Sequence, residues 1–494
     1  MTRMPPPRVA AAAPSPGSPL PADRRSPLRA AHAGAPGAAP GTATAAPAAP
    51  AAAAAPAAGT AAEAGTAGPA DGSGLPAPLH GPAFSTYQPD EVSWLLTDLT
   101  DLPLHAARTP PAADPAHAAP SPALPDQRGG PPQPAAVPAP APAPAPAEPP
   151  VAAIGHLDPR VETLPVEYQP DPGHLALYRE ALDACAARVA RAIGTLTETV
   201  IAERGREQPD GFGGNIVLAS IARAGTPVGI LMRRWAAYGH GIRLRHYSLA
   251  MVRGRGMDPA ALRHLASHHD PADVVFVDGW TGRGVRAREL AAALDGTPFV
   301  PELAALTDPS GAVATFGTRD DLLVPTVHLD STAYGLVSRP VLRPGVLGPD
   351  DFHGAIQFRE LASADVSAAY LDAITARFDE VRDAAVAEAA ELVEADPEDR
   401  APTWAGWELA ERLSERFALG TPERVRPGVG ETLRVLERAE PLRVLVRAGA
   451  SEAGHGPSDD VGLRQVLALA ERRAVPVDRV ADLPCTCVGL IAPR

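Results

Sequence analysis

The sequence predicts an α/β protein in which a mostly parallel sheet is flanked by helices and a small α/β/α domain follows. Short apolar runs alternate with amphipathic stretches across residues 175–294, which is the pattern of βαβ units. The alternation restarts after Gly420, and Pro and Ala dominate the chain before residue 151. We therefore expect a larger domain at 151–420, a smaller one at 421–494 and a long disordered N-terminal region.

The N-terminal region buries too little apolar surface to offset the entropy of its chain. Most of the 59 prolines lie in it, and we expect disorder at 1–83 and 105–150. Between these tracts, residues 84–104 carry aromatic and leucine side chains and predict a short segment that docks on the folded body. Pro89, followed by two acids, indicates the start of a helix there. A partner-binding motif in a disordered tail is the alternative.

The elements of the larger domain follow from periodicity. Apolar residues recur at steps of three or four from Leu175 to Val200, which predicts a long amphipathic helix with Cys185 in its buried stripe. The predicted strands are 216–220, 246–252, 274–278 and 322–329. The other predicted helices are 228–238, 259–268, 285–294 and 364–393.

The smaller domain alternates in the same way, and its length is near the minimum for independent folding. We expect helices at 430–437 and 463–473 and strands at 442–447 and 487–491.

Composition excludes several function classes. All 44 basic residues are arginine, so a Schiff-base lysine, a pyridoxal phosphate anchor and a Walker-type phosphate lysine are excluded. A formal charge of −14 argues against a surface that coats nucleic acid. Three cysteines do not make a disulfide framework and suit a reducing compartment. Proline interrupts every long apolar run and no signal peptide opens the chain, so we expect a cytoplasmic protein without a membrane span.

A candidate phosphate-binding loop follows the apolar run 274–277. Asp278, Gly279 and Trp280 come next, and the segment Thr281-Gly282-Arg283-Gly284 leads into a predicted helix. Small residues at the end of a strand let backbone N–H groups approach phosphate oxygens, and the N-terminus of a helix favours an anion. An ordinary turn capped by Asp278 is the alternative.

Two further loops follow the neighbouring predicted strands. Ser220, Arg223, Gly225 and Thr226 come after the first strand, and Arg223 suits an anion such as pyrophosphate. Arg253 and Arg255, separated by glycine, form a flexible cationic loop after the second. Ion-paired or solvated arginines are the alternatives. The segments 328–339 and 351–355 are rich in polar residues and glycine. They could bind an acceptor base or a metal, and plain surface loops are the alternative.

These blocks together resemble the phosphoribosyltransferase-like proteins of tellurium-resistance (Ter) stress operons, often labelled cysteine protease StiP. The blocks are 220–229, 247–258, 275–284, 331–339 and 351–355. The resemblance implies a type I phosphoribosyltransferase fold that binds phosphoribosyl pyrophosphate, with Mg²⁺ as cofactor. Asp278 and Arg223 would be catalytic. The implied substrate-binding residues are Ser220, Gly225, Thr226, Arg253, Arg255, Trp280, Thr281, Gly282, Arg283 and Gly284.

The function predicted from this resemblance is transfer or exchange of a base at the anomeric carbon of the ribose. Gly279 stands where the ordinary enzymes carry a second acid, so a non-catalytic regulator that senses nucleotides is the first alternative. A thiol protease is the minor alternative, because Cys185 falls on a buried helical stripe and Cys485 and Cys487 fall in a predicted C-terminal strand.

The smaller domain resembles Pelota-like and kink-turn RNA-binding domains at Gly428–Arg434. The resemblance implies RNA binding by Gly428, Gly430, Glu431 and Arg434. Residues 421–494 contain 11 arginines and 10 acids, so their charge is nearly balanced, whereas an RNA-binding surface is normally clearly basic. The predicted partners are a phosphoribosyl or nucleotide ligand, RNA, and a second copy of the chain in a homo-oligomer.

Overall fold

The computed structural model describes residues 74–102, 165–209, 211–449 and 461–493. The tract predicted to be disordered at 105–150, and most of the tract at 1–83, lie outside the described residues.

The larger domain is built on a six-stranded parallel sheet with the order β1-β4-β3-β7-β8-β9. The strands are β1 (Ser93–Leu95), β3 (Val217–Ile221), β4 (Arg245–Leu249), β7 (Val274–Trp280), β8 (Leu303–Thr307) and β9 (Thr315–Thr318). The chain continues from β3 to β4 on one side and from β7 to β8 on the other, so the strand order reverses between β3 and β7. Ligands of open α/β sheets bind beyond the carboxyl ends of the strands at such a point.

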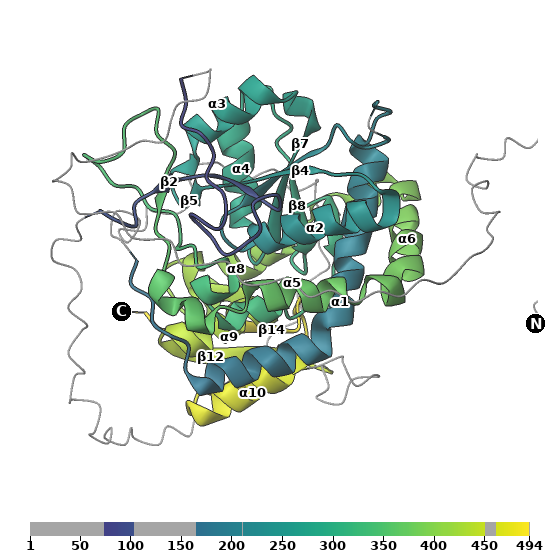
Figure 1. The fold of residues 1–494 in the computed structure, drawn as a ribbon. Helices are drawn as coiled ribbons and strands as arrows, with labels where there is room; N and C mark the ends of the chain where they lie inside the picture. Colours follow the sequence, from purple (N-terminus) through teal and green to yellow (C-terminus); the bar gives the residue numbers. More distant parts are fainter. Residues whose placement is uncertain (1–73, 103–164, 210, 450–460, 494) are drawn as a thin grey trace, which may run out of the picture. The chain divides into compact units, whose positions relative to one another are not determined.

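Helices cover both faces of this sheet (Figure 1). One face shares a hydrophobic core with α1 (Pro172–Arg204), α2 (Gly225–His240), α5 (Ser367–Thr375) and α6 (Phe378–Glu394). The opposite face packs against α3 (Pro259–His268) and α4 (Val285–Leu294). None of the described helices is long and apolar enough to cross a membrane.

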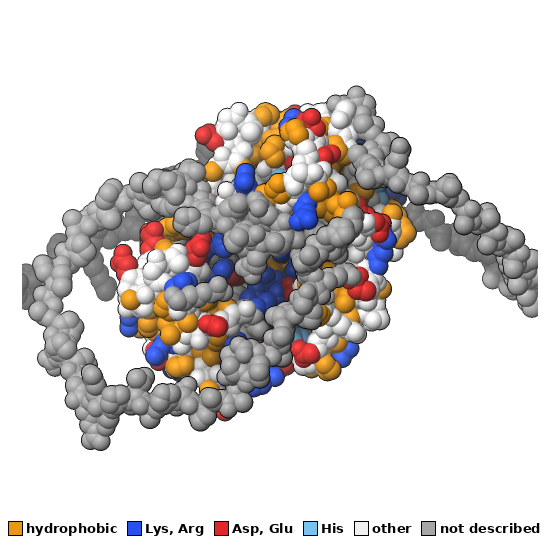
Figure 2. Space-filling view, turned by 90° about the vertical axis from the view of Figure 1, so that its left-hand side faces the viewer, with side chains coloured by type: hydrophobic (Ala, Val, Ile, Leu, Met, Phe, Trp, Pro, Cys, Tyr) orange, Lys and Arg blue, Asp and Glu red, His pale blue; other side chains and the backbone are white. Residues whose placement is uncertain are grey.

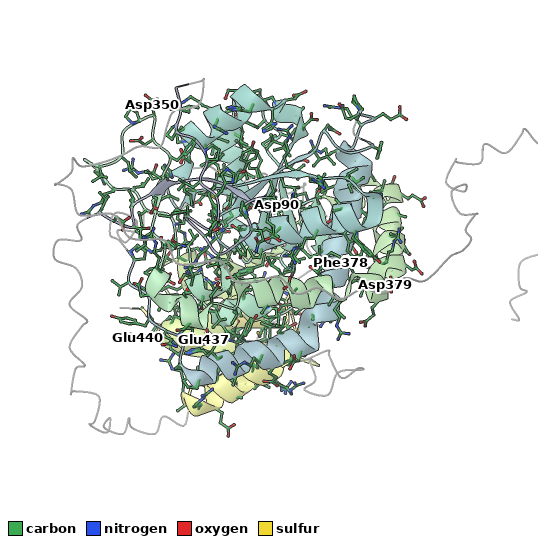
Figure 3. The ribbon with its side chains drawn as sticks, viewed as in Figure 1. Asp90, Asp350, Phe378, Asp379, Glu437 and Glu440 are labelled. Atoms are coloured by element: carbon green, nitrogen blue, oxygen red, sulfur yellow. The ribbon has the colours of Figure 1, made fainter. Side chains whose placement is uncertain are left out.

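Aromatic side chains pack between helices α2 and α6. Phe378, labelled in Figure 3, begins α6 and lies with its ring centroid 4.8 Å from that of Trp235 on α2. Cys185 is fully buried on α1, as its place in the apolar stripe predicts.

The segment at 84–99 packs against the larger domain and does not form a helix. Its β1 strand pairs with β4 and extends the sheet, and Trp94 is fully buried. A short β2 (Thr97–Asp98) pairs with β10 (Gly354–Ala355). The helix prediction from Pro89 is wrong because strand pairing and burial of the aromatic side chains outweigh the local cap signal.

The small C-terminal domain has a four-stranded sheet with the order β11-β14-β12-β13. Its strands are β11 (Val425–Pro427), β12 (Pro441–Arg447), β13 (Val477–Val480) and β14 (Cys487–Ile491). One face packs against α8 (Ala405–Arg416), and α9 (Val429–Arg438) and α10 (Val461–Arg472) cover the other. A short α7 (Pro397–Arg400) precedes α8.

Two of the predicted strands also need correction. Residues 322–329 contain a 3-10 turn at Pro325–His328 instead of a strand, because Pro325 removes a ladder donor. The strand predicted at 246–252 breaks after Leu249, and β5 (Met251–Val252) forms a hairpin with β6 (Gly256–Met257).

Candidate functional site

The candidate site is a pocket of about 550 Å³ beyond the carboxyl ends of β3 and β7. The larger domain contributes the loops that follow these two strands, and the C-terminal domain contributes β11 and α9. Helices α2 and α4 both begin beside it. The pocket therefore lies at the reversal point of the sheet and is closed on one side by the smaller domain.

Arginine dominates the lining of this pocket. The lining residues carry eight arginines against three carboxylates, a formal charge of +5 in a chain of −14. Figure 2 shows a face of the molecule on which Arg side chains gather in a hollow. The arginines are Arg223, Arg253, Arg283, Arg286, Arg339, Arg426, Arg434 and Arg438, and the carboxylates are Asp278, Glu289 and Glu431.

Asp278 lies at the end of β7 and is 1% exposed. Its Oδ2 accepts a hydrogen bond from Arg286 Nη1 at 2.9 Å, and its Oδ1 accepts one from the Gly279 N–H at 2.8 Å. Burial raises the pKa of Asp278, and Arg286 offsets only part of that rise. Gly225 allows this close packing, because a Cβ there would lie 2.5 Å from the Val277 carbonyl oxygen. Asp278 is thus a paired, buried carboxylate.

Arg223 is held by two acids. Its guanidinium binds Glu167 at 2.6 Å and also pairs with Asp330. Burial alone would lower the pKa of Arg223, but the two carboxylates outweigh it and raise that pKa. Its positive charge is therefore largely compensated.

Arg283 is compensated less, since Glu423 and Glu431 attract it only from a distance. It is 6% exposed, lines the pocket, and makes no hydrogen bond or ion pair with any residue that the structure describes. Burial and repulsion from Arg426 and Arg253 lower the pKa of Arg283 to about 9. A buried guanidinium without a partner is costly unless an anion joins it. Gly284, at φ +81°, follows Arg283 and immediately precedes α4. The N-terminus of this helix also favours an anion.

The C-terminal domain contacts the end of β7 directly. Trp280 Nε1 donates to Glu431 Oε1 at 3.0 Å, and the Arg434 guanidinium lies 5.2 Å from the centroid of the Trp280 ring. Glu431 also pairs with Arg426 at 3.1 Å. Burial would raise the pKa of Glu431, but Arg426 and Arg434 lower it to about 2.

The pocket brings together part of the predicted set and leaves part of it outside. The predicted residues that line it are Arg223, Arg253, Asp278, Trp280, Thr281, Gly282, Arg283, Glu431 and Arg434. The predicted residues that do not line it are Ser220, Gly225, Thr226, Arg255, Gly284, Gly428 and Gly430.

The excluded side chains have other contacts. Ser220 Oγ lies 2.8 Å from His246 Nε2 and Thr226 Oγ1 lies 2.7 Å from Ser248 Oγ, all in the core. Arg255 is exposed in the turn between β5 and β6. Ser220 and Thr226 therefore belong to the core, and Arg255 lies outside the pocket.

Sequence reasoning missed Arg286, Arg426 and Arg438, and it included Arg339 only as the end of the candidate segment 328–339. The missed Arg438 had a usable signal, since Glu431, Arg434 and Arg438 are spaced by three and four residues and share one face of a helix. Arg426 had none, because only the tertiary fold brings it to the loop after β7.

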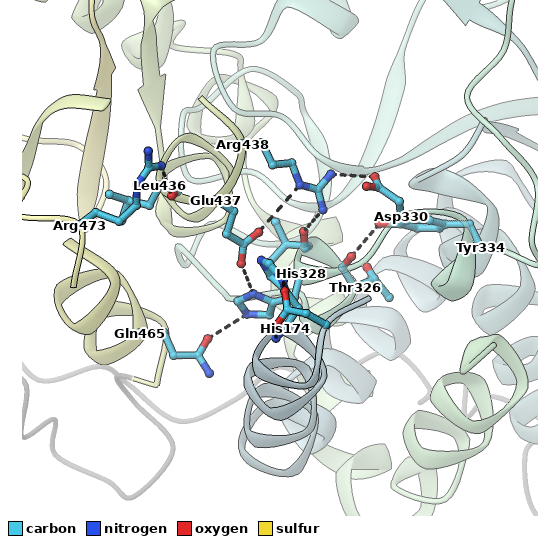
Figure 4. Close-up of polar contacts among 12 residues, drawn as sticks. His174, Thr326, His328, Asp330, Tyr334, Leu436, Glu437, Arg438, Gln465 and Arg473 are labelled. Atoms are coloured by element: carbon cyan, nitrogen blue, oxygen red, sulfur yellow. Dashed lines mark hydrogen bonds and ion pairs between the residues drawn. The ribbon is translucent and has the colours of Figure 1, made fainter. Parts of the chain in front are cut away.

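His328 begins the segment 328–339, for which an acceptor site, a metal site and a plain surface loop were all left open, and it is buried between the domains. It lies 2.7 Å from Glu437 Oε1 through Nδ1 and 2.9 Å from Gln465 Oε1 through Nε2 (Figure 4). This contact joins the larger domain to α9 and α10.

The Mg²⁺ predicted to accompany a phosphoribosyl ligand stays a prediction. Mg²⁺ is usually bound by one or two carboxylates together with substrate phosphates. Asp278 is engaged by Arg286, and across the described ranges no group of three or more His, Cys, Asp or Glu could hold a metal ion.

All three cysteines are buried. Cys185 and Cys487 are 0% exposed and Cys485 is 1% exposed. Burial raises the pKa of Cys185 to about 11 and raises that of Cys485 further. A nucleophilic thiol needs the opposite shift and access to substrate.

Comparisons with known proteins match both domains. Residues 158–375 match the family model described as tellurite-like stress resistance cysteine protease StiP, and residues 404–493 match the PELOTA RNA binding domain. A protein of Acinetobacter baylyi (strain ATCC 33305 / BD413 / ADP1), named cysteine protease StiP, is 28% identical over 333 residues. That alignment covers 65% of this chain and 81% of the relative. No solved structure matches significantly.

These matches overturn the phosphoribosyltransferase prediction. The model and the relative that match the larger domain both bear the name of a stress-resistance cysteine protease, which was only the minor alternative from the sequence. The resemblance to the StiP family and to a Pelota domain is confirmed. Assignment of the parallel sheet to the type I phosphoribosyltransferase fold stays a prediction.

Proposed function

We propose that this chain is a stress-response protein that binds RNA, and that the arginine-lined pocket receives RNA phosphates. One observation carries the proposal: in an acidic chain, eight arginines gather where the segment that matches an RNA-binding domain meets the larger domain. Lys and Arg side chains supply most of the affinity for a phosphate backbone by releasing its counterions.

The pocket also explains how a C-terminal domain with little net charge could take part in binding RNA. Residues 421–494 contribute Arg426, Arg434 and Arg438 to the pocket, and the other five arginines come from the larger domain. The cationic site is therefore shared, and a charge count on the smaller domain alone underestimates it.

Arg283 is the residue on which the proposal depends most. Arg283 is 6% exposed and makes no hydrogen bond or ion pair with a described residue, and a phosphate oxygen would supply a direct partner. Trp280, which is partly exposed, provides aromatic surface in the same pocket for a base.

The proposal is tested by fluorescence anisotropy with a labelled RNA stem-loop that contains both paired and unpaired segments. We expect the full chain to bind it with an affinity that falls steeply with salt. Arg283→Gln should weaken binding about tenfold, the loss expected for one charge-assisted hydrogen bond. The control Arg472→Gln changes an exposed arginine of α10 outside the pocket and should leave binding unchanged. Equal loss in both variants, or no binding by the wild type, would sink the proposal.

A second candidate function is cysteine protease activity, which the names of the matched family and relative favour. It requires one of the three buried thiols to become accessible. Casein hydrolysis that is abolished by Cys185→Ala, Cys485→Ala or Cys487→Ala, in a variant that remains folded, would establish it.

A further inference from the structure

We infer that the pocket takes its RNA as an unpaired strand and excludes duplex and kink-turn RNA. This inference rests on the proposed function and names the class of RNA that the same site selects. Three features of the contact between the domains support it.

First, the helix that carries the predicted RNA-binding residues faces inward. Glu431 accepts from Trp280, Arg434 lies over the Trp280 ring, and Arg438 donates to Asp330 at 2.7 Å. These contacts turn one face of α9 into a wall of the pocket. A large folded RNA cannot lie on that face while the larger domain covers it.

Second, the N-terminus of α9 is already occupied. Asp321 Oδ1 accepts a hydrogen bond from the Val429 N–H at 2.8 Å, and Asp321 Oδ2 accepts one from the Thr486 N–H at 2.9 Å. Gly428, which precedes the helix, faces the same carboxylate. The helix end that would favour a backbone phosphate on an isolated domain therefore binds a carboxylate of the larger domain.

Third, the pocket has the size of a small-molecule site. Its volume of about 550 Å³ falls in the range of roughly 300–1,000 Å³ for pockets that enclose a small ligand. Recognition of duplex RNA instead needs an extended surface. Outside the pocket, Arg443 pairs with Asp478 and Arg464 pairs with Glu180, so these two arginines of the C-terminal domain are already engaged.

Trp280 is the aromatic residue of the pocket that suits an unpaired base, because it is partly exposed whereas Tyr334 is fully buried. The Arg434 guanidinium lies 5.2 Å from the centroid of the Trp280 ring. Unpaired bases stack on aromatic rings and on guanidinium planes, whereas paired bases are stacked within their own helix. We therefore assign a stacking role to Trp280 and a phosphate contact to Arg283.

The test compares three labelled RNAs by anisotropy with the full chain: an unstructured 15-nucleotide strand, the same strand annealed to its complement, and a kink-turn. We expect the single strand to bind at least tenfold more tightly than the other two. Equal or tighter binding of the duplex or the kink-turn would overturn the inference while leaving RNA binding intact. No binding of any RNA would remove the proposed function and this inference together.

Two variants of one residue test the stacking role. Trp280→Ala should weaken single-strand binding about 5- to 100-fold, which is the range for one stacked base. Trp280→Phe keeps the ring but loses the donor to Glu431, and it should restore most of the affinity. If both variants lose affinity equally while their thermal unfolding matches the wild type, Trp280 acts through Glu431 and the stacking role is wrong.

Discussion

At the scale of single residues, the pocket contains two arginines in opposite situations three positions apart. Arg286 is paired with the buried Asp278, and its side chain is 43% exposed. Arg283 is buried and has no direct partner among the described residues. Arg286 stabilises the fold. Arg283 destabilises it unless an anion binds beside the guanidinium.

This difference predicts opposite effects of the same substitution. Arg283→Met should raise the free energy of unfolding without ligand by about 1–4 kcal/mol, because an apolar side chain replaces a buried unpaired charge. Arg286→Met should lower it by about 1–3 kcal/mol, because Asp278 loses its partner. Urea unfolding at neutral pH measures both. A destabilised Arg283→Met protein would show that Arg283 has a structural partner after all.

At the scale of elements, local periodicity predicted most helices and several strands, but it missed two strands of the larger sheet. The helices at 259–268 and 285–294 have the predicted bounds, because their apolar spacing and their flanking residues agree. Strands β8 and β9 were missed, since runs of four or five residues carry little periodic signal. The loops after β3 and β7 could be assigned to one site because parallel strands end at the same edge. The C-terminal wall of that site could not, because no sequence pattern places Arg426 beside Trp280.

The β1 strand gives a prediction at this scale. Trp94 is fully buried, its Nε1 donates to Ser85 Oγ at 3.1 Å, and its ring contacts those of Phe84 and Tyr87. Trp94→Ala should therefore cost about 3–5 kcal/mol, the usual range for a large aromatic residue in a core. Tyr168→Ala, at a residue that is 67% exposed, is the control. A loss below 1 kcal/mol in chemical denaturation would mean that the segment at 84–99 is not part of the core.

At the scale of the whole described body, one hydrophobic core runs from the larger domain into the C-terminal domain. It includes Leu196 of α1, Leu433 of α9 and Leu463 of α10. The polar contacts of His328 with Glu437 and Gln465 cross the same boundary (Figure 4). We expect the two domains to unfold together, because neither can expose this shared surface without loss.

Asp321 provides the sharpest test of that coupling. Its half-buried carboxylate accepts the N–H groups of Val429 and Thr486, so Asp321→Ala leaves two donors of the C-terminal domain unsatisfied. Each orphaned donor costs about 1–3 kcal/mol, and we expect hydrogen exchange to show residues 425–493 opening before the sheet of the larger domain. The adjacent Asp320→Ala, at a carboxylate that is 71% exposed, should keep a single transition. Asp321→Ala should also lose the preference for single-stranded RNA, because a released C-terminal domain presents α9 as an open surface. If Asp321→Ala unfolds in one step and still rejects duplex RNA, the occupied helix end does not set the selectivity of the pocket.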